Sequence, residues 1–351
     1  MEVMRTSLYI PANNPVFVGK CSKYPADIIT FDIEDAVPPQ EKENARKMAA
    51  ENLVKAGENG AEVYVRVNGW HTEYTNDDLE AVVYPGLNGI TLPKTRNADD
   101  VKRLDWKISE LEQRRGIPAG SVKISVLLET AEGIMNAYQI CTASPRIVSA
   151  FFGAVDYCAD MRITRTNRAE EQKVARSIVA IAARAAGIVA LDAPFADFSN
   201  MEDFRKNTLD GRQMGFEGRM IIHPSQIAVA HELYSPTAEE VEHAAKVKKF
   251  FEEEGLAKGY DFDRVGGGAL LAILANSTDT NIIARSSRER QLALTEELKA
   301  LLAQTPYPDK DALAALDDRF IAENLSPGGS ADLLALTWLL HFVTTEGNID
   351  E

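Results

Sequence analysis

Short apolar segments alternate with helix-like segments along residues 6–222, and this alternation restricts the fold more than any other feature of the chain. Nearly continuous apolar strands that alternate with helices are typical of parallel strands buried on both faces. Eight such strands predict a closed (β/α)8 TIM barrel, an α/β fold. The expected strands are Thr6–Ile10, Ile28–Ile33, Glu62–Val67, Gly89–Leu92, Val122–Leu128, Ile147–Phe152, Ile188–Leu191 and Met220–Ile222.

The segments between the strands favour the same interpretation. Helices are expected at Gln40–Ala56 and Ala98–Arg115. Asn97 stands at the N-cap position of the second helix, and acidic residues follow in its first turn. An open doubly wound sheet is the competing architecture. No GxGxxG motif follows an early strand, which removes the fingerprint of its dinucleotide-binding form.

The C-terminal part of the chain has a different pattern. A glycine-containing link at Gly255–Gly268 precedes a region that is helical in character throughout. We therefore predict a barrel domain over residues 1–260 and an all-α extension over residues 261–351. The helices expected in the extension are Ala269–Ala275, Arg288–Gln304, Lys310–Asn324 and Ser330–Val343.

The chain is strongly acidic, with 38 Lys and Arg against 53 Asp and Glu and a net charge of −15. A polyanion repels a phosphate backbone, so we expect neither nucleic acid nor an anionic membrane as a partner. A phosphate-bearing ligand would need a local basic cluster. Arg162, Arg165 and Arg168 would form one basic ridge on a helical turn. The alternative is a solvated helix face paired with Glu170 and Glu171.

The cysteine content and the terminal sequence indicate the compartment. Cys21, Cys141 and Cys158 have no CxxC spacing, which argues against both a disulfide framework and a structural zinc site. The N-terminal apolar run is too short for a signal peptide, and no segment approaches the roughly 18 apolar residues of a membrane span. We expect a protein of the cytoplasm.

Acidic residues follow two neighbouring strands. Glu129 comes directly after the fifth expected strand, and Asp156 follows the sixth. Barrel active sites lie at the carboxyl ends of the strands, so these carboxylates are expected to converge. Two oxygen ligands with open positions suit Mg²⁺, which is completed by water and substrate oxygens. The alternative is a pair of helix N-caps or surface acids.

A basic residue and an acidic cluster end the second and third strands. Arg66 presents a planar fork that recognises a carboxylate or a thioester oxygen. An ion pair with Asp32, Glu34 and Asp35 is the structural alternative, and the two roles are compatible. Alternation would place Asp32 and Glu34 on one side of an extended strand and Asp35 on the other. Helix capping is the alternative role for Asp35.

Seven ordered motifs across about residues 5–230 resemble the citrate lyase beta subunit family, which groups with HpcH/HpaI-type aldolases and malyl- and citramalyl-CoA lyases. The motifs are SLYIPANNP, FDIEDAV, VRVNG, LPKT, LLETAEGI, FGAVDY and GFEGRMIIHPSQI. The resemblance implies a (β/α)8 barrel. It also implies a Mg²⁺-dependent carbon–carbon lyase that cleaves a citryl thioester to oxaloacetate and an acetyl thioester.

The same resemblance assigns roles to particular residues. Glu129 and Asp156 match the metal ligands of the family, and Arg66 matches its substrate-binding arginine. Glu34 and Asp35 match an acidic motif that supports the metal through water. A malyl-CoA, citramalyl-CoA or other 3-hydroxyacyl-CoA substrate is the alternative within the family.

The resemblance also implies partners. Asn13, Asn14 and His223 lie in segments that match the border of the thioester carrier, which is coenzyme A or an acyl carrier protein. From the residues alone, a histidine before a proline is more often a hydrogen-bonded structural residue, so His223 is expected only to line the site. Other lyase subunits and a homo-oligomer, a trimer or a hexamer, are the further expected partners.

The tail carries a second resemblance, to the C-terminal part of triphosphoribosyl-dephospho-CoA synthase. It rests on LLAILANSTDTNIIARSS and LDDRFIAENLSPGGSADLLALTWLLHF. The lyase family has a lid segment with a catalytic acid after the barrel, where this chain reads GYDFDRVGGGALL with Asp261 and Asp263 as the available acids. A non-catalytic assembly subunit, and a nucleotide-handling tail around Asp279, Asn281 and Arg285, are the alternative functions.

Overall fold

The computed structural model describes residues 3–166, 169–238, 241, 242, 245, 249, 255–276 and 278–327. The chain divides into two compact units, Met1–Ser235 and Pro236–Glu351. This division lies ahead of the boundary expected at residue 260. Much of the intervening stretch is outside the described residues, so the assignment of residues 236–260 to the barrel domain stays a prediction.

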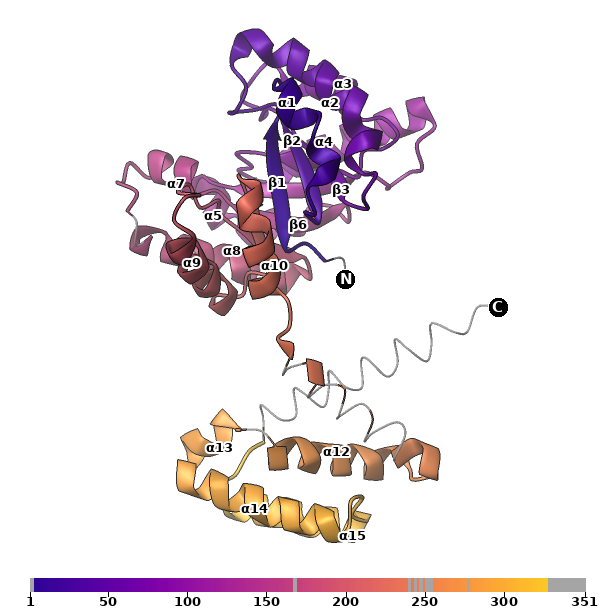
Figure 1. Cartoon of the computed structure of the whole chain (residues 1–351), viewed down its shortest axis with the longest axis vertical. Helices are drawn as coiled ribbons and strands as arrows, with labels where there is room; N and C mark the ends of the chain where they lie inside the picture. The colour runs from indigo at the N-terminus through magenta and orange to yellow at the C-terminus, as the bar shows by residue number, and fades with distance from the viewer. Residues whose placement is uncertain are drawn as a thin grey trace. The chain divides into compact units, whose positions relative to one another are not determined.

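The first unit is the closed barrel that the sequence predicts (Figure 1). Neighbouring strands pair in parallel in chain order, and β8 pairs with β1 to close the ring. Each observed strand agrees with a predicted one to within about two residues at either end. The strands are β1 (Thr6–Pro11), β2 (Ile28–Asp32), β3 (Glu62–Arg66), β4 (Gly89–Leu92), β5 (Lys123–Leu128), β6 (Ile147–Phe152), β7 (Val189–Asp192) and β8 (Gly218–Ile221).

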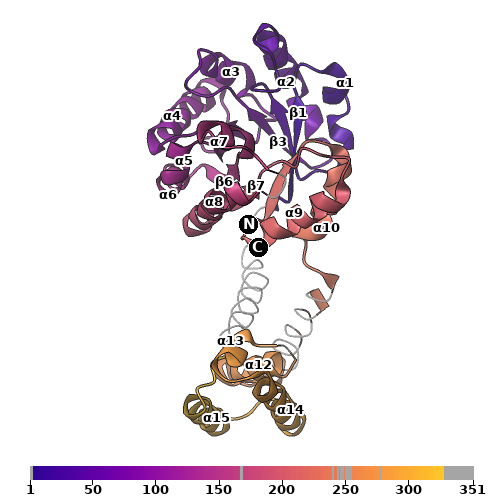
Figure 2. The same cartoon turned by 90° about the vertical axis from the view of Figure 1, so that its left-hand side faces the viewer.

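Helices surround the strands of this unit (Figure 2). They are α1 (Pro15–Val18), α2 (Lys42–Ala56), α3 (Thr75–Val82), α4 (Ala98–Arg115), α5 (Ala131–Met135), α6 (Ala137–Cys141), α7 (Ala154–Asp160), α8 (Lys173–Ala186), α9 (Met201–Gln213) and α10 (Ile227–Tyr234). Short 3-10 helices lie at Cys21–Lys23, Pro39–Glu41, Glu170–Gln172 and Pro224–Gln226.

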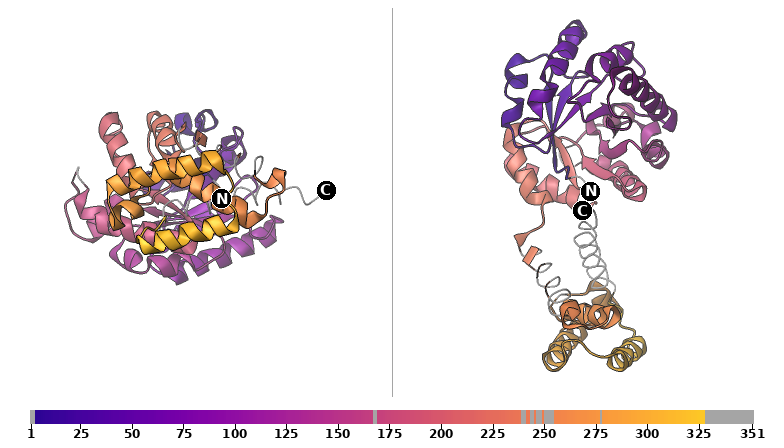
Figure 3. Two further views of the ribbon diagram at one scale, coloured as in Figure 1. Left: turned by 90° about the horizontal axis from the view of Figure 1, so that it is seen from below. Right: turned by 90° about the vertical axis from the view of Figure 1, so that its right-hand side faces the viewer.

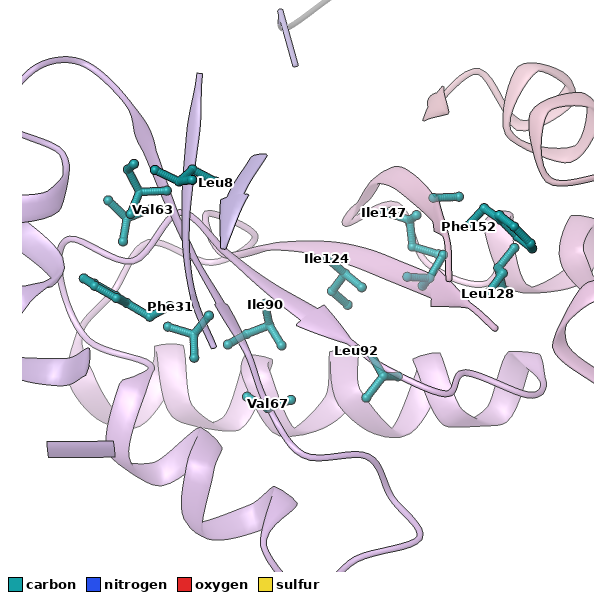
Figure 4. Close-up of a cluster of buried hydrophobic side chains, with 14 of the residues drawn as sticks. Leu8, Phe31, Val63, Val67, Ile90, Leu92, Ile124, Leu128, Ile147 and Phe152 are labelled. Atoms are coloured by element: carbon teal, nitrogen blue, oxygen red, sulfur yellow. The ribbon is translucent and has the colours of Figure 1, made fainter. Parts of the chain in front are cut away.

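Both faces of the strands are buried, which explains their nearly continuous apolar sequences. Leu8 and Ile10 belong to the layer between strands and helices, whereas Tyr9 belongs to the cluster inside the barrel. Successive residues of a strand point to opposite faces, so each strand contributes to both layers. Figure 4 shows labelled members of the outer layer: Leu8, Phe31, Val63, Val67, Ile90, Leu92, Ile124, Leu128, Ile147 and Phe152.

The second unit contains the helices α12 (Phe262–Asn276), α13 (Thr280–Arg285), α14 (Arg288–Gln304) and α15 (Lys310–Ala322), with a 3-10 helix at Leu256–Lys258. They are drawn from orange to yellow in Figures 1 and 3. Leu274, Ile282, Leu294 and Phe320 join these helices in one apolar core. The predicted helices up to residue 324 are confirmed in this unit, and the one expected at residues 330–343 lies outside the described residues.

One local prediction is wrong, and the condition of a second is not met. The segment with Arg162 and Arg165 is not helical, because α7 ends at Asp160 and Arg162 has a left-handed backbone with φ of 57°. The basic ridge therefore does not form there, and Arg168 lies outside the described residues. Strand β2 ends at Asp32, so Asp35 is not held on the opposite side from Glu34 by strand alternation.

The described part of the chain contains neither a disulfide nor a membrane-spanning helix. Its three cysteines are free and buried, as their sparse spacing predicts. No helix in this part is long and apolar enough to cross a bilayer.

We predict that Asn97→Ala destabilises the barrel unit by about 1 kcal/mol, because the side chain of Asn97 accepts hydrogen bonds from the backbone N–H groups of Asp99 and Asp100 at the start of α4. Urea denaturation followed by circular dichroism measures the change. Asn44→Ala, at an exposed position in α2, is the control and should stay within about 0.5 kcal/mol of wild type. Equal stability of both variants would contradict the capping role.

Candidate active site

The barrel brings polar residues from five consecutive strand ends to one mouth. Asp32 and Arg66 are the last residues of β2 and β3, and Lys94 follows β4. Glu129 follows β5, and Asp156 lies in the first turn of α7, after β6. Parallel strands end at the same face of a barrel, so residues separated by more than a hundred positions meet there.

Arg66 is held by two acids, Asp32 at the end of β2 and Glu34 in the turn that follows. Its Nε lies 2.8 Å from Oδ1 of Asp32, and its Nη2 lies 2.5 Å from Oδ2 of the same residue. Its Nη1 lies 3.1 Å from Oε2 of Glu34. Burial opposes the charge of Arg66, but the two acids outweigh it and raise its pKa well above the ordinary value. The expected ion pair is therefore present, and it holds the guanidinium in one orientation.

Lys94 links the remaining acids. Its ammonium nitrogen lies 2.5 Å from Glu34, 3.0 Å from Asp35 and 3.6 Å from Asp156. Burial disfavours the charged form of Lys94, but Glu34 and its neighbours reverse the effect and raise the pKa of the ammonium. Lys94 thus ties the acidic cluster after β2 to the helix after β6.

Glu129 is one of the two most enclosed acids of the mouth, with 2% of its surface exposed, as for Asp32. Its Oε1 accepts a hydrogen bond from the backbone N–H of Lys94 at 2.8 Å. Its carboxylate packs against Gly153, where any Cβ would clash with it. Burial, followed by the charge of Asp156, raises the pKa of Glu129 from 4.5 to about 8. The two predicted metal ligands therefore lie within each other's electrostatic field.

The carboxylates of the mouth outnumber the cations that contact them. Arg66 and Lys94 form direct ion pairs with four carboxylates, those of Asp32, Glu34, Asp35 and Asp156, and Glu129 accepts only the backbone N–H of Lys94. A third cation, Lys42, donates to the backbone oxygen of Glu34 from behind. With every group ionised, the cluster would keep an excess of two negative charges. The raised pKa of Glu129 keeps a proton on its carboxyl below about pH 8, and the excess there is one negative charge.

The donor set fits Mg²⁺ rather than a metal enclosed by protein ligands. Among the described residues, no group of three or more His, Cys, Asp or Glu side chains is arranged to hold an ion. Mg²⁺ is commonly bound through one or two carboxylates, with water and substrate supplying the other oxygens. The buried carboxylate of Glu129 and the half-buried carboxylate of Asp156 would supply these two ligands. A zinc ion would need more protein ligands.

The remaining predicted residues lie at the rim. The side chain of Asn14 accepts hydrogen bonds from Val16 and Phe17 and caps the short helix α1, and Asn13 is half-buried beside it. His223 follows β8, its Nδ1 lies 2.7 Å from the hydroxyl of Ser225, and its ring stacks on Phe198. His223 therefore has the hydrogen-bonded structural role expected for a histidine before a proline. Among the described residues, no hydrogen bond or ion pair joins Asn13, Asn14 or His223 to the acidic cluster.

Sequence reasoning missed Lys94 as a site residue. Its signal was present, because a lysine directly follows a buried strand in the motif LPKT. The left-handed backbone of Lys94, with φ of 48°, had no sequence signal since this conformation is uncommon for residues other than glycine. Glu34 and Asp35 were expected on opposite sides, but both carboxylates reach Lys94 because they lie in the turn after β2.

A parallel eight-stranded barrel with a polar mouth at the carboxyl ends of its strands is the architecture of a (β/α)8-barrel enzyme. The chain belongs to the HpcH/HpaI aldolase/citrate lyase family, whose model matches residues 5–224. The predicted family and the predicted carbon–carbon lyase class are both confirmed at this level. Residues 141–350 match a second family model, ATP:dephospho-CoA triphosphoribosyl transferase, which agrees with the resemblance predicted for the tail.

Individual relatives agree with this membership. The chain is 33% identical over 297 residues to "Citrate lyase subunit beta" of Leuconostoc mesenteroides subsp. cremoris, covering 85% of this chain and 95% of the relative. It is 30% identical over 267 residues to "L-malyl-CoA/beta-methylmalyl-CoA lyase" of Rhodobacter capsulatus, covering 69% of this chain and 82% of the relative.

Solved structures give the same result. The citrate lyase beta subunit of Mycobacterium tuberculosis complexed with oxaloacetate and magnesium has a TM-score of 0.57 and 29% identity, covering 67% of this chain and 98% of that one. A second structure from that organism contains magnesium, acetoacetate and coenzyme A, with a TM-score of 0.58 and 28% identity over 70% of this chain and 86% of that one.

We predict that metal-free protein loses stability as pH rises, because of Glu129. The raised pKa means that the folded state binds a proton that the unfolded state has already released between pH 4.5 and about 8. The free energy of unfolding therefore falls across this window and is unaffected by Glu129 below it. Thermal melts in EDTA should show a steeper decline for wild type than for Glu129→Gln, which keeps the acceptor for Lys94. Parallel pH profiles would contradict the assignment.

Proposed function

We propose that this chain is a Mg²⁺-dependent lyase that cleaves a citryl thioester to oxaloacetate and an acetyl thioester. The observation that carries the proposal is the gathering of Arg66, Glu129 and Asp156, from three different strand ends, at one acidic mouth. Relatives named citrate lyase subunit beta, and a relative complexed with oxaloacetate and magnesium, support it.

In this proposal Glu129 and Asp156 hold the metal, and Glu34 and Asp35 support it through water. When bound, Mg²⁺ would supply a Lewis acid that grips the substrate carboxylate and the neighbouring tertiary hydroxyl and lowers the pKa of that hydroxyl. The chain's own contribution is to fix the two ligands. Glu129 is held by the backbone N–H of Lys94, and the N-terminal turn of α7 carries Asp156.

Arg66 acts on the acyl side of the substrate. A guanidinium carries five N–H donors, and its hydrogen bonds to Asp32 use two of them, while Nη1 forms an ion pair with Glu34. The remaining donors would be available to the thioester oxygen. Because Asp32 already fixes the guanidinium plane, little reorganisation is needed when negative charge develops on that oxygen.

The bond changes in this reaction balance without an oxidant or a reductant. Loss of the hydroxyl proton turns the alcohol carbon into the ketone of oxaloacetate, and the adjacent carbon–carbon bond breaks. Its electron pair passes to the thioester as an enolate, which Arg66 stabilises. Protonation of the enolate carbon gives the acetyl thioester.

The carrier and the assembly belong to the same proposal. Asn13, Asn14 and His223 would border a carrier that is coenzyme A or the prosthetic group of an acyl carrier protein. A relative with bound coenzyme A supports a carrier of this kind. The trimer or hexamer, the other lyase subunits and the cytoplasmic location stay predictions.

We predict that purified protein with Mg²⁺ releases oxaloacetate from citryl-CoA or a citryl carrier protein, measured by coupling to malate dehydrogenase. Glu129→Ala and Asp156→Ala should each lower kcat/KM by at least about 100-fold, because each removes one of two protein ligands. EDTA should abolish turnover of wild type, and Mg²⁺ should restore it.

Glu110→Ala is the matched control for these variants. Glu110 is an acid ion-paired with Lys107 on the outer helix α4, so its loss should leave kcat/KM unchanged. If wild type forms no product, or if the two site variants match wild type, the lyase proposal is rejected.

A malyl-CoA, citramalyl-CoA or other 3-hydroxyacyl-CoA substrate is the second candidate, supported by the relative named L-malyl-CoA/beta-methylmalyl-CoA lyase. We predict that a panel of these thioesters gives the highest kcat/KM for the citryl thioester. A higher kcat/KM for malyl-CoA would show that malyl-CoA is the preferred substrate and would leave the assignment as a carbon–carbon lyase unchanged.

The helical unit belongs to the alternative functions, a non-catalytic assembly subunit whose tail docks partner chains, or a nucleotide-handling tail. Asp279 is buried and caps α13 by accepting from the N–H groups of Asn281 and Ile282, which favours its structural alternative over nucleotide handling. Asp261 accepts from the backbone of Arg264 in the same unit. The side chain of Asp263 lies outside the described residues, so a replacement for the lid acid stays a prediction.

A further inference from the structure

Lys94 contacts the acidic mouth through two different groups. Its backbone N–H donates to Glu129, while its side-chain ammonium lies against Glu34, Asp35 and Asp156. One residue therefore touches both proposed metal ligands and both acids assigned to support the metal through water. No role has been given to the side chain of Lys94 in the proposed reaction.

The position of Lys94 is fixed by the turn that carries it. The backbone is left-handed, a conformation that persists in residues other than glycine where the surroundings hold it. The next residue provides this support, because the N–H of Thr95 donates to the oxygen of Leu127 and its hydroxyl donates to the oxygen of Leu92. The side chain is 18% exposed, so the ammonium is directed at the acids and largely removed from solvent.

We propose that Lys94 is a positioning residue that serves as the built-in counter-cation of the metal site. In metal-free protein its ammonium lies among Glu34, Asp35 and Asp156 and offsets part of their repulsion. When a divalent cation binds at Glu129 and Asp156, the ammonium withdraws from Asp156 and keeps Glu34 and Asp35. This inference rests on the metal ligands assigned in the proposed function.

The contact distances favour this exchange. The ammonium is closest to Glu34 and farthest from Asp156, so the contact to a proposed metal ligand is the weakest of the three. Two positive charges a few ångströms apart repel strongly in a partly buried site. Lys94 must therefore lower the affinity for a metal ion while it stabilises the site before the metal arrives. The metal site would then be filled reversibly.

The test measures Mn²⁺ binding by electron paramagnetic resonance, with the metal alone and no thioester. Lys94→Met keeps the length of the side chain and removes its charge, and the left-handed backbone suits methionine no less than lysine. We expect Lys94→Met to bind Mn²⁺ at least about tenfold more tightly than wild type. Its metal-free melting temperature should be lower, with a larger rise on adding metal.

Two further variants separate charge from folding. Lys107→Met is the matched control, because Lys107 bridges Glu80 and Glu110 on the outside of the barrel, and it should leave Mn²⁺ affinity unchanged. Lys94→Arg keeps the charge and should bind Mn²⁺ within a few-fold of wild type. Should Lys94→Met fail to fold, a weaker affinity in Lys94→Gln than in wild type, or an equal one, decides against the inference.

The outcomes also distinguish this inference from the function on which it rests. Unchanged or weaker Mn²⁺ binding by Lys94→Met, with normal binding by wild type, overturns the role of Lys94 alone. Tighter Mn²⁺ binding by Lys94→Met, without turnover of any thioester by wild type, supports the counter-cation role of Lys94 and rejects the proposed lyase activity. Absence of Mn²⁺ binding by wild type overturns both.

Discussion

The clustering of acids at the mouth of the barrel is the constraint on which the rest of the site depends. Parallel strands deliver Asp32, Glu129 and the turn with Glu34 to one face, and burial makes the ionised forms of such acids expensive. Arg66 and Lys94 offset part of this cost through ion pairs, yet the carboxylates still outnumber the cations. Burial, with a further contribution from the charge of Asp156, raises the pKa of Glu129.

The barrel supplies the rigidity that this charge arrangement needs. Glu129 is placed by a backbone donor and by its contact with Gly153, so its position depends on two different loops rather than on a flexible side chain alone. Arg66 is similarly fixed along one edge of its guanidinium, where Nε and Nη2 donate to the two carboxylate oxygens of Asp32. Side chains held by their neighbours keep the geometry that electrostatic catalysis requires, because little reorganisation remains to be done when charge develops.

Most of the fold, and some of the residues that meet at the mouth of the barrel, could be predicted from the sequence. Strand positions could be predicted because burial on both faces leaves long apolar runs, and Asn97 could be predicted as a cap because its chemistry is local. The strand ends also indicated Arg66 and Glu129 as candidate site residues, and the structure places both at the mouth of the barrel. The role of Lys94 could not be predicted, since it depends on a left-handed turn and on acids up to about sixty residues away. The helical prediction for the segment with Arg162 was wrong for the same reason, because no local sequence pattern indicated the irregular backbone there.

The two family matches overlap, and the structure separates their meaning. Residues 141–224 match both models, but they contain β6, β7 and β8, which close the barrel between β5 and β1. A closed barrel cannot lose three strands and remain closed, so this shared stretch belongs structurally to the lyase part of the chain. The distinctive portion of the transferase match is therefore the helical unit with its own apolar core around Leu274 and Leu294. A separate core means that the unit's folding does not depend on the acids of the mouth.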